Sequence, residues 1–139
     1  MSVLKRDARG VRAEVTEGRD LVISSWHRNH LDRRCYMTDL DAVEYRFFQR
    51  GLEVRALVEY KAWHVRQDRF VLCSALEVKL WIARRCEVPL FHVWYEAEAG
   101  GEILRFRLWD VTATGMVTNY WDLAREMSAP EFRALMENL

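Results

Sequence analysis

One stretch of the chain, residues 38–64 (TDLDAVEYRFFQRGLEVRALVEYKAWH), constrains the fold most because it reads as a β-hairpin. Its centre, Gln49-Arg50-Gly51, predicts a three-residue loop in which Gly51 takes the positive φ that such a loop needs. The runs on either side are rich in Val, Tyr, Phe and Leu, as β-strands are. The sequence therefore predicts two long antiparallel strands here.

The register of this hairpin decides which charged residues meet. Pairing Phe48 with Leu52 and counting outward gives two cross-strand pairs on one face of the hairpin, namely Asp41 with Glu59 and Asp39 with Lys61. A slip of one residue would break this agreement. The pattern therefore predicts three carboxylates and one ammonium at one end of the hairpin.

Two interpretations of this charge cluster remain open from the spacing. Like charges side by side repel, and a hard divalent cation such as Mg²⁺ would relieve that repulsion. Lys61 would then orient a water molecule or stabilise a developing negative charge. In the other interpretation the hairpin is half-solvated, its outer face is simply charged, and its buried face is formed by Ala56, Val58, Tyr60 and Ala62.

The order Asp41, hairpin, then Glu59-Tyr60-Lys61 resembles the signature of the PD-(D/E)xK nuclease superfamily. The segments YMTDLDAVEYR, ALVEYK and VPLFHVWYE are similar to small nuclease-like proteins of that superfamily from phages and prokaryotes. The similarity covers about residues 26–96, plus a closing helix. One departure is that Thr38 stands where the motif has its proline.

The resemblance implies an α/β fold with a mixed central sheet flanked by helices, as in the restriction-endonuclease-like core. It implies a nuclease that hydrolyses phosphodiester bonds of nucleic acid, with DNA as the expected substrate. In that scheme Asp41, Glu59 and the main-chain carbonyl of Tyr60 hold Mg²⁺ or Mn²⁺, and Lys61 positions or activates water. Asp39 is a further candidate ligand.

Other residues are weaker candidates for contacts with the substrate. Arg33 and Arg34 precede the first hairpin strand, where paired guanidinium groups would suit a phosphate, although a solvated turn explains them equally well. His30 lies on the polar side of a helix predicted over residues 18–31. The resemblance adds Gln67 and Arg69, because related nucleases often place such a residue on the helix after their lysine.

Length and composition fit a single domain over residues 1–139, with residues 1–17 as a frayed extension or an edge strand. The formal net charge is zero, with 21 basic and 21 acidic residues, so nucleic-acid binding would need a local patch. Cys35, Cys73 and Cys86 lack zinc spacing and read as buried, reduced thiols. The sequence shows no signal peptide and no apolar run long enough for a membrane span, which favours a cytoplasmic protein.

The second half of the chain predicts four further elements. They are a helix over about 69–86 with Asp68 as its N-cap, a strand over 90–95, a strand over 102–111, and a closing helix opened by the capping box Ser128-Ala-Pro-Glu131. Residues 112–122 read as a loop. On the strand over 102–111, Arg105, Arg107 and Trp109 share a face, a mixture that suits nucleic acid or an ordinary amphipathic surface.

A second function, from a different class, fits the same residues. A nuclease-like fold without catalysis could act as a nucleic-acid-binding or protein-binding module, which zero net charge and abundant aromatic residues favour. A homodimer is also expected, with Trp81 or Trp109 in its interface. Intact Asp41, Glu59 and Lys61 favour the enzyme.

Overall fold

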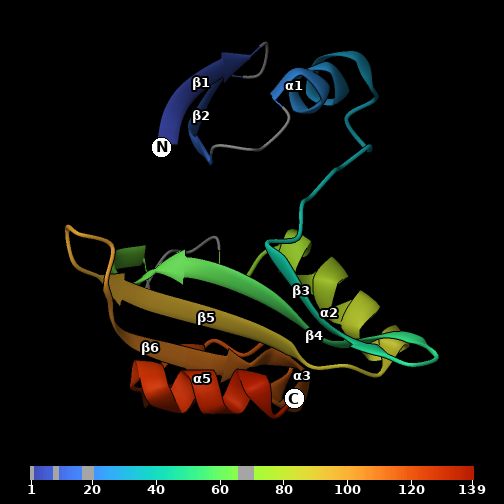
Figure 1. Ribbon diagram of the computed structural model, residues 1–139. Helices are drawn as coiled ribbons and strands as arrows, with labels where there is room; N and C mark the ends of the chain where they lie inside the picture. The colour runs from blue at the N-terminus through green and yellow to red at the C-terminus, as the bar shows by residue number, and fades with distance from the viewer. Residues whose placement is uncertain (1, 8–9, 17–20, 66–70) are drawn as a thin grey trace. The chain divides into compact units, whose positions relative to one another are not determined.

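The computed structural model describes residues 2–7, 10–16, 21–65 and 71–139. The chain divides into two compact units, residues 1–39 and residues 40–139 (Figure 1). The expectation of one domain over the whole chain stays a prediction, and each unit is described by itself. Asp68, Gln67 and Arg69 lie outside the described residues. The helix predicted from about residue 69 begins instead at Ser74 with Cys73 as its N-cap, so the predicted start and the Asp68 cap are wrong.

The first unit holds a hairpin and one helix. Strands β1 (Ser2–Asp7) and β2 (Gly10–Thr16) pair antiparallel. Helix α1 spans Leu21–His30, within the helix predicted over 18–31. The described residues of the segment expected as a frayed extension or an edge strand therefore form a two-stranded sheet.

The second unit is built on a five-stranded sheet in the order β3-β4-β5-β6-β7. The β4–β5 pair is parallel and the other neighbouring pairs are antiparallel. The strands are β3 (Ala42–Phe48), β4 (Gly51–Ala62), β5 (Leu90–Ala97), β6 (Ile103–Asp110) and β7 (Arg125–Met127). The helices are η1 (Trp63–Val65), α2 (Ser74–Cys86), α3 (Val111–Thr114), α4 (Tyr120–Leu123) and α5 (Ala129–Glu137). The predicted α/β class with a mixed sheet flanked by helices is confirmed.

The β3–β4 hairpin has a different loop from the predicted one, but the same register at its charged end. Phe48 pairs with Gly51, so the loop has only Gln49 and Arg50, and Gly51 takes φ +134°. A β-bulge between Glu44 and Tyr45 then shifts the pairing by one residue. Beyond the bulge, Ala42 pairs with Val58, the register that the sequence predicts. The shorter loop and the bulge cancel, and the charged end of the hairpin keeps its expected alignment.

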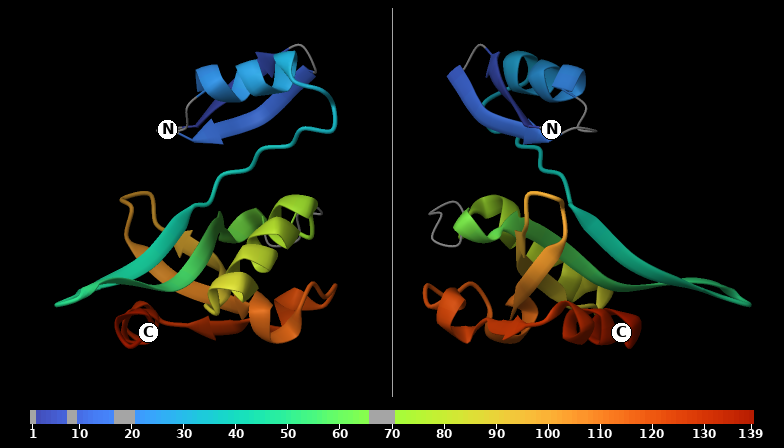
Figure 2. Two further views of the ribbon diagram at one scale, coloured as in Figure 1. Left: turned by 90° about the vertical axis from the view of Figure 1, so that its right-hand side faces the viewer. Right: turned by 60° about the vertical axis from the view of Figure 1, so that its left-hand side comes forward.

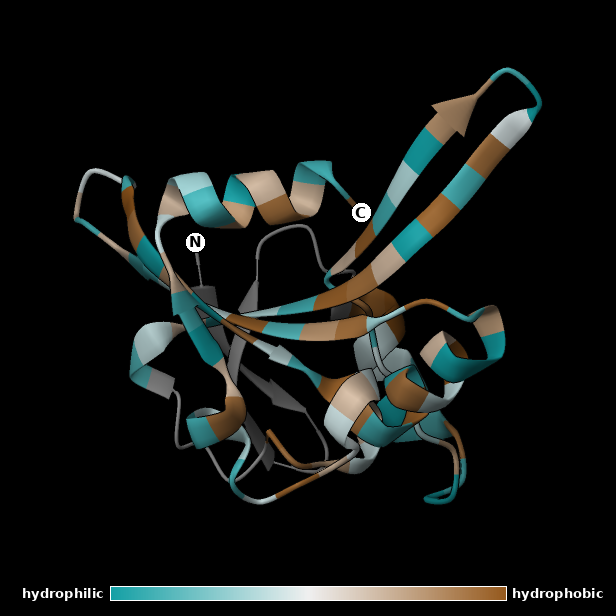
Figure 3. Ribbon diagram, turned by 90° about the horizontal axis from the view of Figure 1, so that it is seen from below, coloured by the Kyte–Doolittle hydropathy of each residue, from teal (hydrophilic) through white to brown (hydrophobic). Residues whose placement is uncertain are grey.

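The sheet is covered on both faces. Helix α2 packs Leu76, Leu80 and Ala83 against one face, where Leu57 and Trp94 lie. On the opposite face α5 packs on a core formed by Ala56, Val58, Phe91, Val93, Leu108, Phe132 and Met136. The β3–β4 hairpin extends beyond both layers (Figures 2 and 3). The centre of β4 is buried on both faces. The interpretation of a half-solvated hairpin therefore applies only to the outer half of the hairpin.

The predicted loop over 112–122 is confirmed only for residues 115–119, because short helices lie on either side of them. Val111–Thr114 forms α3, which Asp110 caps by accepting from the amide of Ala113, and Tyr120–Leu123 forms α4. The chain then adds β7 to the sheet edge. Elements of three or four residues are too short to show a hydrophobic period, so their positions come from tertiary packing.

The capping box that opens α5 is confirmed. The Ser128 hydroxyl accepts from the amide of Glu131 at 3.2 Å, and the Glu131 carboxylate accepts from the amide of Ser128 at 3.2 Å. Phe132 and Met136 of this helix are buried. The cap fixes where α5 begins and so which of its faces meets the sheet.

Replacing Ser128 with Ala is expected to lower the free energy of unfolding by about 1 kcal/mol, because one amide at the start of α5 loses its acceptor. Urea denaturation monitored by circular dichroism measures this loss. Ser74→Ala is the control, since the α2 N-cap is Cys73 and makes no side-chain cap. Equal stability of Ser128→Ala and the wild type would contradict the role given to the cap.

Candidate functional site at the charged end of the hairpin

Asp41 and Glu59 lie side by side where β3 begins. Asp41 directly precedes the Ala42–Val58 pair, so it continues the register to Glu59. The Asp41 amide donates to Glu59 Oε1 at 3.5 Å, and the Tyr60 amide donates to Asp41 Oδ2 at 2.9 Å. Each carboxylate thus accepts from the backbone of the other strand. The two contacts hold the paired carboxylates in the arrangement that the sequence predicts.

Glu59 also meets a partner that sequence reasoning did not assign. Lys79 of α2 places Nζ 2.7 Å from Glu59 Oε1, and both side chains are only 9% exposed. Lys79 follows Leu76 by three residues and precedes Ala83 by four, so helical spacing puts it on the face that packs on the sheet. The sequence does contain a signal for this pair. Lys79 lies on the apolar stripe of a predicted helix, and a lysine placed there needs a buried carboxylate such as Glu59 as its partner.

Burial sets the electrostatics of the pair. Burial raises the pKa of the Glu59 carboxyl, the nearby Asp41 raises it further, and the Lys79 ammonium opposes both. Burial also raises the pKa of the Tyr60 hydroxyl, with Glu44 and Asp41 adding to the rise. The Lys79 ammonium therefore offsets part of the cost of burying the Glu59 carboxylate.

His92 of β5 is the second residue that the sequence did not single out. It pairs with Glu59 in the parallel register and is 2% exposed. Its ring lies against Trp94, with centroids 4.3 Å apart, and its buried Nδ1 makes no hydrogen bond. Burial lowers the pKa of His92 to about 3, helped by the charges of Lys61 and Lys79. The imidazole is neutral at physiological pH, and only the β4–β5 register could have linked it to Glu59.

Lys61 lies two residues after Glu59 on β4, so both side chains leave the same face of the sheet. Its side chain is exposed, as is Asp41, whereas Glu59 is buried. The site therefore has a buried end at Glu59 and an open end at Asp41 and Lys61. Asp39 belongs to the other unit, so the predicted pairing of Asp39 with Lys61 stays a prediction.

None of the remaining substrate-contact candidates lies among the described residues of the second unit. His30, Arg33 and Arg34 belong to the first unit. There the His30 ring stacks on Trp26 with centroids 5.3 Å apart, and Arg34 pairs with Asp32 at 3.1 Å. Gln67 and Arg69 fall outside the described residues. Their roles stay predictions.

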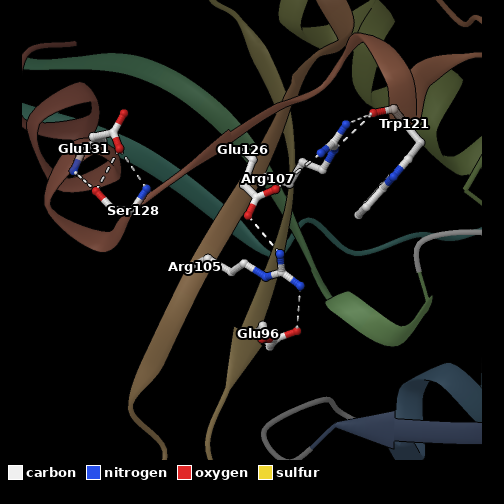
Figure 4. A network of polar contacts seen from close by, with 7 residues as sticks. All are labelled: Glu96, Arg105, Arg107, Trp121, Glu126, Ser128 and Glu131. Atoms are coloured by element: carbon white, nitrogen blue, oxygen red, sulfur yellow. Dashed lines mark hydrogen bonds and ion pairs between the residues drawn. The ribbon is translucent and has the colours of Figure 1, made fainter.

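The arginines of β6 are held within the protein. Arg105 bonds to Glu126 at 2.9 Å and Glu96 at 3.2 Å, and Arg107 donates to the Trp121 carbonyl at 2.7 Å (Figure 4). The Arg105 guanidinium also lies 4.0 Å from the centre of the Trp63 ring. Trp109 is 1% exposed, so it cannot stack on a base or lie in a dimer interface, and that expectation is wrong. Of the interpretations given for this strand, amphipathic structure fits better than nucleic-acid binding.

Exposed apolar side chains lie elsewhere in the second unit. Trp81 of α2 is 58% exposed and keeps its place as a candidate for a dimer contact. Tyr45, Phe47 and Leu52 on the outer half of the hairpin are also exposed. The prediction of buried thiols is wrong for Cys86 and for Cys35 of the first unit, which are exposed, and Cys73 is half-buried. Among the described residues, no helix combines the length and the apolar character that crossing a membrane requires.

Within the described residues, no three or more His, Cys, Asp or Glu side chains gather in a group that could hold a metal ion. The paired carboxylates of Asp41 and Glu59 are a smaller set, which a main-chain oxygen would have to complete. Comparison with protein-family models, curated proteins and solved structures found no match.

Proposed function

We propose that the Asp41–Glu59 end of the hairpin is the active site of a Mg²⁺- or Mn²⁺-dependent enzyme that hydrolyses phosphodiester bonds, with DNA as the expected substrate. The observation that carries the proposal is the reciprocal contact between the two strands. The Asp41 amide faces Glu59 Oε1, and the Tyr60 amide faces Asp41 Oδ2. The PD-(D/E)xK resemblance assigns a nuclease chemistry to these same positions.

The residues present fit a divalent cation. Mg²⁺ prefers oxygen ligands and usually takes one or two carboxylates, with substrate phosphates and water completing its shell. In a β-strand the amide and the carbonyl of one residue point to the same side. Since the Tyr60 amide points to Asp41, the Tyr60 carbonyl is directed to that side as well. Asp41, Glu59 and Tyr60 would thus hold the ion.

The chain's own groups have distinct tasks in this proposal. A bound Mg²⁺ or Mn²⁺ supplies a lowered pKa for a coordinated water and polarisation of the phosphate. The exposed Lys61 ammonium contacts the negative charge that develops on the phosphate. Buried Glu59 excludes bulk water from one side, while Asp41 and Lys61 leave the other side open to a substrate. Asp39 remains a proposed further ligand, and a cytoplasmic location and a homodimer remain proposals too.

The Glu59–Lys79 ion pair favours a second candidate function. Lys79 already neutralises Glu59 inside the protein, so the charge balance of the buried carboxylate needs no bound ion. A protein of this kind would bind nucleic acid or another protein without cutting. Cleavage assays separate the two functions.

Plasmid, single-stranded DNA, branched DNA and RNA are to be incubated with the protein in Mg²⁺ or Mn²⁺. We expect cleavage of at least one DNA substrate, and a loss of about 10²-fold or more in rate for Glu59→Gln, since a metal ligand contributes several kcal/mol to the transition state. Glu53→Gln is the matched control, because Glu53 is a β4 carboxylate paired with Arg55 at 3.2 Å near the hairpin tip.

The control variant should cleave at the wild-type rate. Wild-type protein that cuts none of the substrates, while still binding one of them, would support the non-catalytic function instead. Equal rates in Glu59→Gln and Glu53→Gln would remove Glu59 from the proposed site.

A further inference from the structure

The Glu59–Lys79 contact places a protein cation on an oxygen of the proposed metal site. Lys79 Nζ lies 2.7 Å from Glu59 Oε1, the same oxygen that faces the Asp41 amide. Lys79 is 7% exposed and sits on the packed face of α2, between Leu76 and Ala83. Its ammonium is therefore held at the carboxylate by the helix and is shielded from solvent.

Binding a divalent cation to Glu59 while the Lys79 ammonium stays on the same carboxylate would cost free energy. A divalent ion and an ammonium repel each other strongly in a buried site, where water screens them poorly. Binding of Mg²⁺ or Mn²⁺ to Glu59 would therefore push the ammonium off Oε1. A buried ammonium without a partner is also unfavourable, so the displaced Lys79 needs a new acceptor.

His92 offers that acceptor. It is the β5 residue directly across from Glu59, and its buried Nδ1 makes no hydrogen bond. The ring is neutral, so Nδ1 carries a free lone pair in the tautomer that is protonated at Nε2. An orphaned buried nitrogen is otherwise a cost to the fold. A donor that reached His92 Nδ1 would remove this cost.

We propose that Lys79 exchanges between two acceptors, Glu59 Oε1 when no divalent cation is bound and His92 Nδ1 when one is. The proposal rests on the proposed function, because it takes Glu59 as a metal ligand. Lys79 is then a positioning residue that competes with the ion for Glu59 and so sets the affinity of the site for the ion. The displaced ammonium stays on the face of the sheet that carries Lys61.

The first test compares Mn²⁺ binding by titration calorimetry at pH 8. Lys79→Met removes the competing cation, and we expect its Kd for Mn²⁺ to be at least tenfold lower than that of the wild type. Arg85→Met is the matched control on the exposed side of the same helix, where Arg85 lies over Trp81, and should bind Mn²⁺ as the wild type does. Glu59→Gln should lose the response, which assigns the ion to this site.

The Kd values of the wild type and Lys79→Met for Mn²⁺ decide between the exchange, the metal site without the exchange, and neither. A tighter Kd in Lys79→Met, or binding by Lys79→Met alone, supports the exchange. An equal or weaker Kd in Lys79→Met, with clear binding by the wild type, overturns the exchange and leaves the metal site standing. Failure of both proteins to bind Mn²⁺ overturns the exchange and the metal-dependent function together.

A second measurement uses the wild-type protein, in case Lys79→Met does not fold. The chain has only three lysines, Lys5, Lys61 and Lys79, and four histidines, so the ammonium and imidazole ¹⁵N resonances can each be assigned. On adding Mg²⁺, we expect the resonances of Lys79 Nζ and His92 Nδ1 to move together and to saturate at the same concentration. Movement of the Asp41 amide resonance, with Lys79 and His92 unchanged, would overturn the exchange while supporting the metal site. No change in any of these resonances would overturn both.

Discussion

Replacing Lys79 with Met is expected to lower the free energy of unfolding by about 3–5 kcal/mol at pH 7 without metal, because it leaves Glu59 buried without its cation. The pair lies at 2.7 Å with both side chains nine-tenths buried, so water cannot take the place of Lys79. The loss should be smaller at pH 5. Burial raises the pKa of Glu59, so the folded protein takes up a proton at Glu59 more readily than the unfolded chain does. Protonation at low pH removes the unpaired charge and stabilises the folded variant, and this stabilisation is lost as the pH rises through the folded-state pKa.

Urea denaturation of four proteins measures this effect: the wild type, Lys79→Met, Glu59→Leu and the double variant. The double variant replaces both charges with apolar groups and should recover most of the stability, because no unpaired charge remains buried. Arg85→Met is again the surface control. A loss below about 1 kcal/mol in Lys79→Met would mean that the ammonium contributes little to the buried carboxylate.

Acid is expected to destabilise the protein through His92. Its pKa is about 3 in the folded protein, against 6.5 for an ordinary histidine, so the unfolded chain binds the proton more readily. The stabilising contribution is complete above pH 6.5 and is lost as the pH falls toward 3. The unfolding free energy should fall by about 2 kcal/mol from pH 7 to pH 5, and by about 4 kcal/mol from pH 7 to pH 3. The groups that face His92 are Glu59 and Lys61 of β4, Lys79 of α2, and the rings of Trp94 and Trp109.

The measurement is the difference in unfolding free energy between pH 7 and pH 5 for the wild type and for His92→Gln. The variant cannot take up the proton, so its difference should be smaller by about 2 kcal/mol. His64→Gln is the control, since it removes an exposed imidazole outside the buried site. The same pH dependence in the wild type and His92→Gln would show that the imidazole is not held neutral by its surroundings.

The β3–β4 hairpin shows which features of the fold the sequence predicts. Runs rich in Val, Tyr, Phe and Leu and the turn at Gly51 predict two strands, and both exist. The predicted register at Asp41 and Glu59 holds only because the two-residue loop is offset by the bulge near Glu44. A bulge has no local signal of its own, since it depends on how the strand bends against its neighbours.

The buried half of the site could not be predicted in the same way. Asp41, Glu59 and Lys61 are neighbours along one hairpin, so local pairing is enough to bring them together. Lys79 and His92 come from the crossover helix and the parallel strand, and their contacts depend on the β4–α2–β5 packing. Local patterns report periodicity but not the register between distant elements. The sequence therefore indicates the carboxylates but not the ammonium that neutralises one of them.

The central claim is that Asp41 and Glu59 together hold a divalent cation, and a crystal of the full chain soaked in Mn²⁺ tests it most directly. The proposal predicts an anomalous peak about 2.0–2.3 Å from a carboxylate oxygen of each residue, with the Tyr60 carbonyl also facing the ion and Lys79 moved away from Glu59 Oε1. A structure with no peak between the two carboxylates, and with the Lys79 ammonium still bound to Glu59, would contradict it.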